Sequence, residues 1–286
     1  MTAPDLARPA SAEEACRTLG AAGEDAIVIA GGTAVVLMLR QGLIAPSLLV
    51  SLDRIDGLSA IEVAAEMLRI GARVTLDEIA ASATVRAHAP ALARACGLVG
   101  NVRVRNAATL AGNLAEADYA SDPPAVLACL GATCRVRGPD GARMVPIADL
   151  ITGFYSTALS PAELITEILV PVAGRGERST YLKYVTRSSE DRPCVGVAAR
   201  AFFRGDAIGG LSVTVGAVGS VPASRPDVCA SVSGSRLDDA TIAKVANGYS
   251  ASIDPIEDAR GSAWYRSEMI RVFITRALND LRSSGG

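Results

Sequence analysis

Short apolar runs alternate with amphipathic stretches in the N-terminal part of the chain. Residues 26–30 (AIVIA) and 46–53 (PSLLVSLD) are apolar runs that favour buried strands. Residues 12–22 carry an amphipathic helical pattern, and residues 34–42 form a second predicted helix that Gly42 ends. The first 54 residues therefore predict a helix, a strand, a glycine turn, a second helix and a second strand.

The pattern is more varied between residues 55 and 174. Residues 58–74 combine helix-favouring alanines with alternating apolar positions, and the alternation favours a β-hairpin. Residues 104–124 have no sustained period and are dense in small and polar residues, so we expect a long ordered loop, which inside a compact domain is usually functional. Helices are predicted at 75–81, 90–96 and 125–132, with short strands from there to 167–172.

A polar, glycine-bearing break at residues 174–179 is the best candidate for a domain boundary. Three strand-like runs and two helical stretches follow it, at 181–187, 195–203, 211–220, 238–248 and 261–283. One apolar stripe runs along the last helix, formed by Tyr265, Met269, Phe273, Ala277 and Leu281. We expect an N-terminal domain at 1–174, with subdomains at about 1–54 and 55–174, and a C-terminal domain at 179–286 with a three-stranded sheet backed by helices.

Composition excludes several classes of protein. Half of the 286 residues are apolar and 20% are charged, an ordinary balance for a folded protein. The net charge is −2 and only 4% of residues are aromatic, which argues against nucleic acid, since binding it needs concentrated positive charge. No stretch approaches about 18 charge-free apolar residues, and the N-terminus lacks the apolar core of a signal peptide. We expect a cytoplasmic protein without a membrane span.

The cysteines and the single histidine argue against a metal site on this chain. The six cysteines include no CxxC pair, and we interpret them as buried, reduced thiols. An iron–sulfur cluster would need about four closely spaced thiolates. His88 is the only histidine, which argues against a His-based triad or a multi-His zinc site. We therefore assign neither a metal ligand nor a catalytic side chain to this chain.

Residues 30–33 (AGGT) are the first candidate for ligand binding. Tandem glycines after a strand let the backbone approach a ligand closely, and consecutive free N–H groups bind anions. Thr33 adds a hydroxyl where a helix begins, which also favours phosphate. A plain tight turn explains the same residues equally well. The motif is not GxGxxG, so a Rossmann-type dinucleotide site has poor support.

Residues 109–113 (TLAGN), with Asp122 further on, are the second candidate. They offer small residues, a hydroxyl, a carboxamide and a carboxylate, a set that suits a phosphate together with a ribose or adenine edge. The alternative is a structural loop in which Asn113 and Asp122 bond their own backbone. Two such segments in one domain suggest a dinucleotide held between them.

Six segments resemble the FAD-binding medium subunit of the molybdenum hydroxylases, the family of the carbon monoxide, xanthine and nicotine dehydrogenases. In that family's order they are AGGTAVVLMLRQG (30–42), LLVSLDRIDGL (48–58), IGARVT (70–75), RNAATLAGNLAEADYASDPPAVLACLGA (105–132), FYSTALSPAELITEILVP (154–171) and YLKYVTRSSEDRPCVGVAA (181–199). The resemblance implies an α+β fold, with a two-part FAD-binding domain of the p-cresol methylhydroxylase type followed by a small α+β C-terminal domain.

By this resemblance the chain binds FAD without a covalent bond, and two loops hold its pyrophosphate. The residues so assigned to the cofactor are Ala30, Gly31, Gly32, Thr33, Ala34, Val35, Thr109, Ala111, Gly112 and Asn113. Asp122 would help to fix the cofactor, and Leu169 would line the flavin. Lys183 would lie near the polar edge of the flavin, where a cation stabilises the charge of the reduced ring. Taken without the resemblance, Lys183 suits a solvated strand edge.

Four features depart from the family's usual pattern. Ala34 stands where a polar residue is common, so a polar contact is expected to be missing there. Ala111 replaces a glycine, which requires a negative φ at that position. Tyr119 replaces a usual proline. Residues 192–193 occupy a stretch in which some relatives place a flavin-shielding side chain, and this leaves the electron acceptor open.

The resemblance also implies partners. A large subunit would carry a molybdenum cofactor and oxidise the substrate, and a small subunit would carry two [2Fe-2S] clusters, in a dimer of heterotrimers. Electrons would pass from the clusters to the flavin and on to NAD, oxygen or a quinone. Two alternatives stay open: a stand-alone FAD-dependent oxidase or reductase, and a non-enzymatic nucleotide-binding module.

Overall fold

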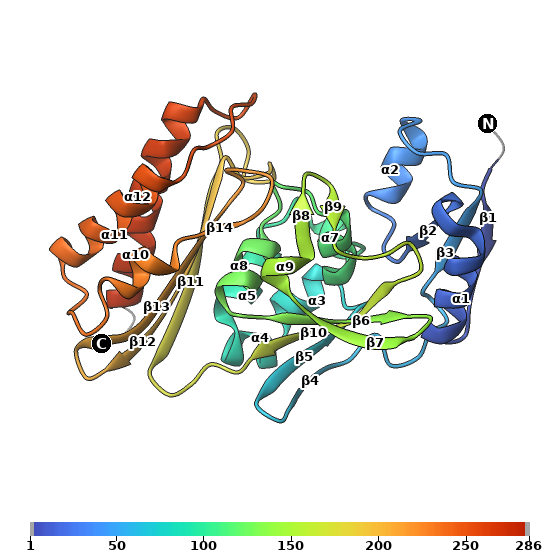
Figure 1. Cartoon of the computed structure of the whole chain (residues 1–286), viewed down its shortest axis with the longest axis horizontal. Helices are drawn as coiled ribbons and strands as arrows, with labels where there is room; N and C mark the ends of the chain where they lie inside the picture. Colours follow the sequence, from blue (N-terminus) through green and yellow to red (C-terminus); the bar gives the residue numbers. More distant parts are fainter. Residues whose placement is uncertain (1–2, 284–286) are drawn as a thin grey trace.

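The computed structural model describes residues 3–283 and shows three parts along its long axis (Figure 1). The N-terminal part contains a parallel three-stranded sheet in the order β1–β3–β2. Its elements are β1 (Asp5–Ala7), α1 (Ala12–Ala22), the 3-10 turn η1 (Gly23–Asp25), β2 (Ala26–Ile29), α2 (Val35–Arg40) and β3 (Leu48–Ser51). Ser11 starts α1, because its side chain accepts a hydrogen bond from the amide of Glu14. The predicted order of elements is confirmed, and the short strand β1 is added.

The middle part is built on an antiparallel five-stranded sheet in the order β4–β5–β10–β6–β7. The strands are β4 (Ile61–Ala64), β5 (Met67–Gly71), β6 (Thr133–Gly138), β7 (Gly141–Pro146) and β10 (Leu164–Pro171). The predicted hairpin at 58–74 is therefore confirmed. Its turn residues Ala65 and Glu66 have φ of 50° and 62°, as a tight two-residue hairpin turn requires.

Helices of the middle part gather over the sheet, between it and the small hairpin β8–β9 (Figure 1). They are α3 (Leu76–Ala81), α4 (Ala83–His88), α5 (Pro90–Gly97), α6 (Val102–Arg105), α7 (Leu110–Glu116), α8 (Pro123–Cys129) and α9 (Ile147–Leu150). The hairpin pairs β8 (Ile151–Gly153) with β9 (Ser156–Thr157). A capping box between Thr75 and Glu78 starts α3, which satisfies amides that the first turn of a helix leaves free.

The expectation of one long loop at 104–124 is wrong. This stretch contains the end of α6, the whole of α7 and the start of α8. Thr109 starts α7 by accepting a hydrogen bond from the amide of Gly112, and Leu110, Ala111 and Leu114 are buried. Its small residues pack closely, so the helix needs no stripe of large apolar residues. Because such a stripe is the sequence signal that predicts a helix, this one could not be predicted from the pattern. Within this stretch only the connections at 106–109 and 117–122 are not helical.

The C-terminal part is an antiparallel sheet in the order β11–β12–β13–β14, with three helices on one face (Figure 1). The elements are β11 (Glu177–Tyr184), β12 (Val195–Arg204), β13 (Ala207–Gly216), β14 (Ala223–Ser224), α10 (Pro226–Ala230), α11 (Asp239–Ser252) and α12 (Ala263–Ser283). The three predicted strands are present, and the two-residue β14 is a fourth. In α12, Phe273, Ala277 and Leu281 of the predicted stripe are buried, whereas Tyr265 and Met269 are partly buried.

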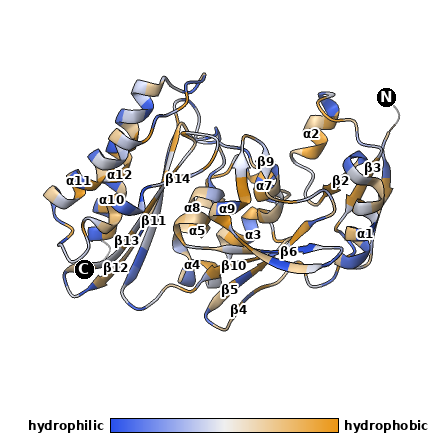
Figure 2. Ribbon diagram, viewed as in Figure 1, coloured by the Kyte–Doolittle hydropathy of each residue, from blue (hydrophilic) through white to orange (hydrophobic). Residues whose placement is uncertain are grey.

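Two hydrophobic cores hold these parts together. The larger one runs from α1 through the middle sheet and its helices, and it includes Tyr181 and Ala198 from the near face of the C-terminal sheet. The smaller one fills the space between that sheet and α10, α11 and α12. Figure 2 shows α2 as largely hydrophobic, although Val36 and Leu37 are 41% and 53% exposed. The helix therefore presents an apolar surface to solvent beside the turn that precedes it.

All six cysteines are buried free thiols, as predicted. Between residues 3 and 283, no helix is long and apolar enough to cross a membrane. Over the same residues, no group of three or more His, Cys, Asp or Glu side chains could hold a metal ion.

Candidate cofactor-binding site

A cleft of about 280 Å³ lies between the N-terminal and middle parts. Small-molecule sites usually measure roughly 300–1,000 Å³, so the cleft suits one section of a larger ligand. It is lined by both predicted loops, through Ala30, Gly31, Gly32, Thr33, Ala34, Val35, Thr109, Ala111, Gly112 and Asn113. The sequence did not point to its apolar walls, which include Leu52, Ala72, Leu159, Leu164 and Ile165. These residues belong to ordinary apolar runs, so no local signal marks them.

The first loop presents a row of free backbone amides. Gly32 has a φ of +70°, which turns the chain between β2 and α2. Within residues 3–283, the amides of Gly31, Gly32, Thr33 and Ala34 donate to no protein acceptor. Ala34 starts α2 without a side-chain hydrogen bond. Consecutive free N–H groups of this kind form a nest that binds anions.

The second loop adds donors from the start of α7. The hydroxyl oxygen of Thr109 accepts from the amide of Gly112 at 3.1 Å. In the described chain the amide of Ala111 has no protein acceptor. Ala111 lies inside the helix and is absent from the positive-φ residues of the described chain, so its methyl group fits the backbone where the family usually has glycine.

The two loops touch each other directly. A Cβ atom built on Gly31 would lie 1.7 Å from the carbonyl oxygen of Ala107, two residues before Thr109. No side chain can occupy that space, because real Cβ atoms essentially never approach other atoms within 3.0 Å. The glycine at position 31 therefore sets the distance between the two loops and, with it, the width of the cleft.

Besides Thr109, three polar side chains line the cleft beyond the first loop: Asn113, Glu116 and Glu163. Asn113 accepts a hydrogen bond on Oδ1 from the hydroxyl of Ser121, at 2.9 Å. Burial raises the pKa of Glu116, and the nearby Asp118 raises it further. Glu163 behaves in the opposite way, because hydrogen bonds from Arg143 are the main cause that lowers its pKa to about 2. Asn113 is one of the residues assigned to the cofactor from the sequence, whereas neither Glu116 nor Glu163 was predicted to line a site.

Asp122 and Lys183 do not line this cleft but form a buried ion pair. The Lys183 ammonium lies 3.0 Å from Asp122 Oδ2 and donates to the carbonyl of Leu98 at 2.8 Å. The hydroxyl of Tyr181 donates to Asp122 Oδ1 at 2.6 Å. Burial raises the pKa of Asp122, and the bonds from Lys183 and Tyr181 only partly oppose that rise. The pair joins the start of α8 to β11, which places it between the middle and C-terminal parts.

Leu169 also lies away from the cleft. It is partly buried in β10, paired with Arg69 on one neighbouring strand and with Thr133 on the other. Its neighbours in the strand, Ile168 and Val170, are buried in the larger hydrophobic core. The structure therefore gathers ten of the thirteen assigned residues at one cleft and leaves Asp122, Leu169 and Lys183 outside it.

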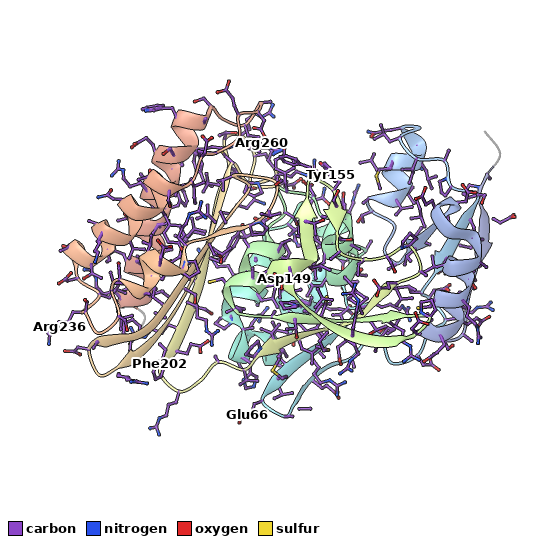
Figure 3. The ribbon with its side chains drawn as sticks, in the orientation of Figure 1. Glu66, Asp149, Tyr155, Phe202, Arg236 and Arg260 are labelled. Carbon is purple, nitrogen blue, oxygen red and sulfur yellow. The ribbon has the colours of Figure 1, made fainter. Side chains whose placement is uncertain are left out.

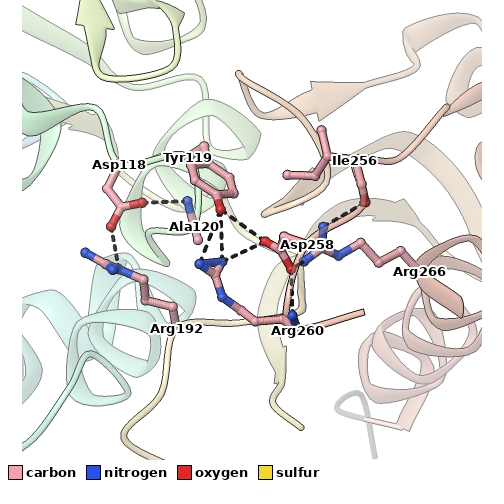
Figure 4. Close-up of polar contacts among 8 residues, drawn as sticks. All are labelled: Asp118, Tyr119, Ala120, Arg192, Ile256, Asp258, Arg260 and Arg266. Carbon is pink, nitrogen blue, oxygen red and sulfur yellow. Dashed lines mark hydrogen bonds and ion pairs between the residues drawn. The ribbon is translucent and has the colours of Figure 1, made fainter. Parts of the chain in front are cut away.

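The connection between α7 and α8 is tied to the C-terminal part by a network of polar contacts (Figure 4). The hydroxyl of Tyr119 donates to Asp258 Oδ2 at 3.0 Å and accepts from Arg260 at 3.3 Å. The buried Arg266 binds the other oxygen of Asp258 at 2.7 Å. Arg192 binds Asp118 at 2.5 Å.

Aromatic side chains surround this network. The ring of Tyr119 packs edge-on against those of Phe154 and Tyr155. Figure 3 places Tyr155, in the β8–β9 turn, and Arg260, ahead of α12, on the same side of the molecule, the upper side in that view. The residue that replaces a usual proline, Tyr119, is thus a contact point between two parts of the fold.

Two family models match the chain. The FAD binding domain in molybdopterin dehydrogenase matches residues 2–173, and the CO dehydrogenase flavoprotein C-terminal domain matches residues 180–281. The carbon monoxide dehydrogenase medium chain of Afipia carboxidovorans is 31% identical, over 96% of this chain and 95% of that protein. This chain belongs to the FAD-binding medium subunits of the molybdenum hydroxylases.

Further relatives agree with this family. The glyceraldehyde dehydrogenase medium chain of Sulfolobus acidocaldarius is 30% identical, over 88% of this chain and 89% of that protein. The structure of reconstituted CO dehydrogenase from Oligotropha carboxidovorans superposes with a TM-score of 0.93 at 31% identity, covering 97% of each chain. As a member of the family, the chain has an FAD-binding domain and is a subunit of an oxidoreductase, which confirms the resemblance and the fold expected from the sequence.

Proposed function

We propose that the chain holds one FAD, noncovalently, in the cleft between the two loops, and that it relays electrons from a partner's iron–sulfur clusters to an external acceptor. The observation that carries this proposal is the convergence of free amides on one cleft. Gly31, Gly32, Thr33 and Ala34 line it from one loop and Ala111 from the other, and among residues 3–283 their amides have no protein acceptor. Phosphate oxygens only accept hydrogen bonds, so a row of donors without protein acceptors fits a pyrophosphate.

The remaining lining also fits a dinucleotide. Leu52, Leu164 and Ile165 supply apolar walls that exclude water from a ring system, and Asn113 adds a polar side chain. When bound, FAD accepts electrons singly or in pairs, which suits a link between one-electron clusters and a two-electron acceptor. The protein residues bind and orient the cofactor, and none of them needs to react with the organic substrate.

The proposed assembly follows the family. The relatives are medium chains of dehydrogenases, which supports a large subunit with a molybdenum cofactor and a small subunit with two [2Fe-2S] clusters. A dimer of heterotrimers and a cytoplasmic location remain predictions from the sequence, as does the domain boundary near residues 174–179. Roles for Asp122, Leu169 and Lys183 at the flavin rest on the resemblance alone.

The test uses the purified full-length chain. We expect a bound flavin spectrum that dithionite bleaches, and acid precipitation that releases all of the flavin into the supernatant. Flavin retained in the pellet would show a covalent bond and contradict the noncovalent assignment. A preparation that binds a nucleotide but no reducible flavin would favour the nucleotide-binding module. Mass spectrometry of the complex isolated from cells would then distinguish a subunit from a stand-alone oxidase or reductase.

A further inference from the structure

The carboxamide of Asn113 is held in one orientation by Ser121. The hydroxyl of Ser121 donates to Asn113 Oδ1 at 2.9 Å, and Asn113 lines the cleft. Among residues 3–283, Asn113 Nδ2 has no protein partner, and this atom is not one of the buried, unsatisfied side-chain atoms. The amino group of the carboxamide is therefore the polar end that Asn113 leaves available for a ligand.

Ser121 lies in a segment that the rest of the protein holds firmly. Its own amide donates to the carbonyl of Asp118 at 3.0 Å, and Asp118 Oδ1 accepts from the amide of Ala120 at 3.0 Å. Tyr119 is bound to the C-terminal part through Asp258 (Figure 4). Asp122 is bound by Tyr181 and Lys183. Contacts on both sides of Ser121 thus fix the position of its hydroxyl.

The two ends of a carboxamide have opposite hydrogen-bonding character. A phosphate can use only the amino end, because its oxygens accept and do not donate. If the carboxamide of Asn113 were reversed, the Ser121 hydroxyl could still accept a hydrogen bond, but its own proton would lose the only acceptor it has in residues 3–283. Leaving a partly buried donor without a partner is unfavourable, so the hydroxyl selects the orientation that points the amino group at the ligand.

We propose that Ser121 is a positioning residue for the cofactor, which orients Asn113 so that its amino group donates to the pyrophosphate. This inference rests on the proposed function, because it requires FAD in the cleft. Ser121 would act only through Asn113 and would not touch FAD. The C-terminal part would contribute to the cofactor site indirectly, through the contacts that hold the segment at 118–122.

A double-mutant cycle on the full-length chain tests the proposal. FAD is titrated into the apoprotein, and the dissociation constant is measured from flavin fluorescence. We expect Asn113→Ala to weaken FAD binding about tenfold and Ser121→Ala about fivefold, the range for loss of one hydrogen bond. In the Asn113→Ala background, Ser121→Ala should cause no further loss. Ser121→Thr, which keeps the hydroxyl, should bind FAD within about twofold of the wild type.

Ser231→Ala is the matched control, because it removes a hydroxyl that bonds the carbonyl of Val228 in the C-terminal part. Its FAD affinity should equal that of the wild type. Equal losses from Ser121→Ala in both backgrounds, or no loss in either, would overturn the proposal while leaving FAD binding intact. A wild-type chain that binds no FAD would instead overturn the proposed function together with this inference.

Discussion

At the scale of single residues, the adjacent positions 31 and 32 require glycine for different physical reasons. Gly31 has no room for a side chain, because a Cβ would collide with the backbone of Ala107. At Gly32 a built Cβ would lie 3.3 Å from the side chains of Ile29 and Val36, a tight contact that requires those side chains to shift by a few tenths of an ångström, and the φ is +70°. The first position is thus set by packing between loops and the second by backbone conformation. The sequence showed a pair of glycines and gave no means of separating their roles.

Gly32→Val should abolish most FAD binding while the chain still folds. A β-branched residue is strained at positive φ, and relief of that strain would turn the amides of the first loop away from the cleft. Gly57→Val is the matched control, because Gly57 has a φ of +79° and nothing within 4 Å of a built Cβ. Thermal unfolding should show a loss of stability in both variants, because both place a β-branched residue at positive φ, and FAD titration should show a loss only for Gly32→Val. Equal FAD affinity in the two variants would contradict the assignment of the first loop to the pyrophosphate.

At the scale of elements, periodic apolar segments were predictable and densely packed small residues were not. The helix at 12–22 carries an amphipathic pattern, and at 58–74 the alternation of apolar positions predicted the hairpin in spite of helix-favouring alanines. The stretch at 104–124 does not, because α7 buries Leu110, Ala111 and Leu114 against close neighbours with few large side chains. The same small residues that make the helix hard to predict would also let a ligand come close to its backbone. The segment predicted from the sequence thus lines the candidate cleft, but its predicted structure, a loop, is wrong.

Tyr119→Phe should destabilise the attachment of the α7–α8 connection to the C-terminal part. The change removes the hydroxyl that contacts Asp258 and Arg260 but keeps the ring that packs on Phe154. We expect a loss of about 1 kcal/mol in the free energy of unfolding, measured with urea. Tyr155→Phe is the control, because Tyr155 is 57% exposed and its hydroxyl has no hydrogen bond in residues 3–283. Equal stability of the two variants would mean that the Tyr119 contact contributes nothing measurable.

At the scale of the whole molecule, the separate parts of the fold could be predicted from the sequence better than the contacts between them. Two cores could be read from apolar runs, but the pairing of Asp122 with Lys183 joins residues 61 positions apart. No periodicity links such positions: Asp122 was a candidate as a carboxylate that follows the second loop, and Lys183 was assigned to the flavin only from the resemblance. In the structure the side chain of Lys183 is 5% exposed and is bound to Asp122 and to the carbonyl of Leu98. We therefore expect its charge to stabilise the contact between α8 and β11.

Lys183→Met should therefore destabilise the fold strongly. Removing one partner of a buried ion pair leaves the other charge uncompensated, which costs about 3–5 kcal/mol. Asp122→Asn combined with Lys183→Met should be less damaging than Lys183→Met alone, because no buried charge remains. Urea unfolding of the three proteins at neutral pH measures both effects.

The pH dependence of the same variant gives an independent check. Burial already raises the pKa of Asp122 above its ordinary value, and loss of Lys183 would raise it further. A carboxyl whose pKa is higher in the folded than in the unfolded state binds protons preferentially when folded, so the stability of Lys183→Met should recover as the pH falls through the folded pKa toward the ordinary pKa of the unfolded chain. The double variant should lack this recovery. If Lys183→Met instead unfolds like the wild type and lowers only the flavin midpoint potential, then Lys183 acts at the flavin edge, and the ion pair does not hold the two parts together.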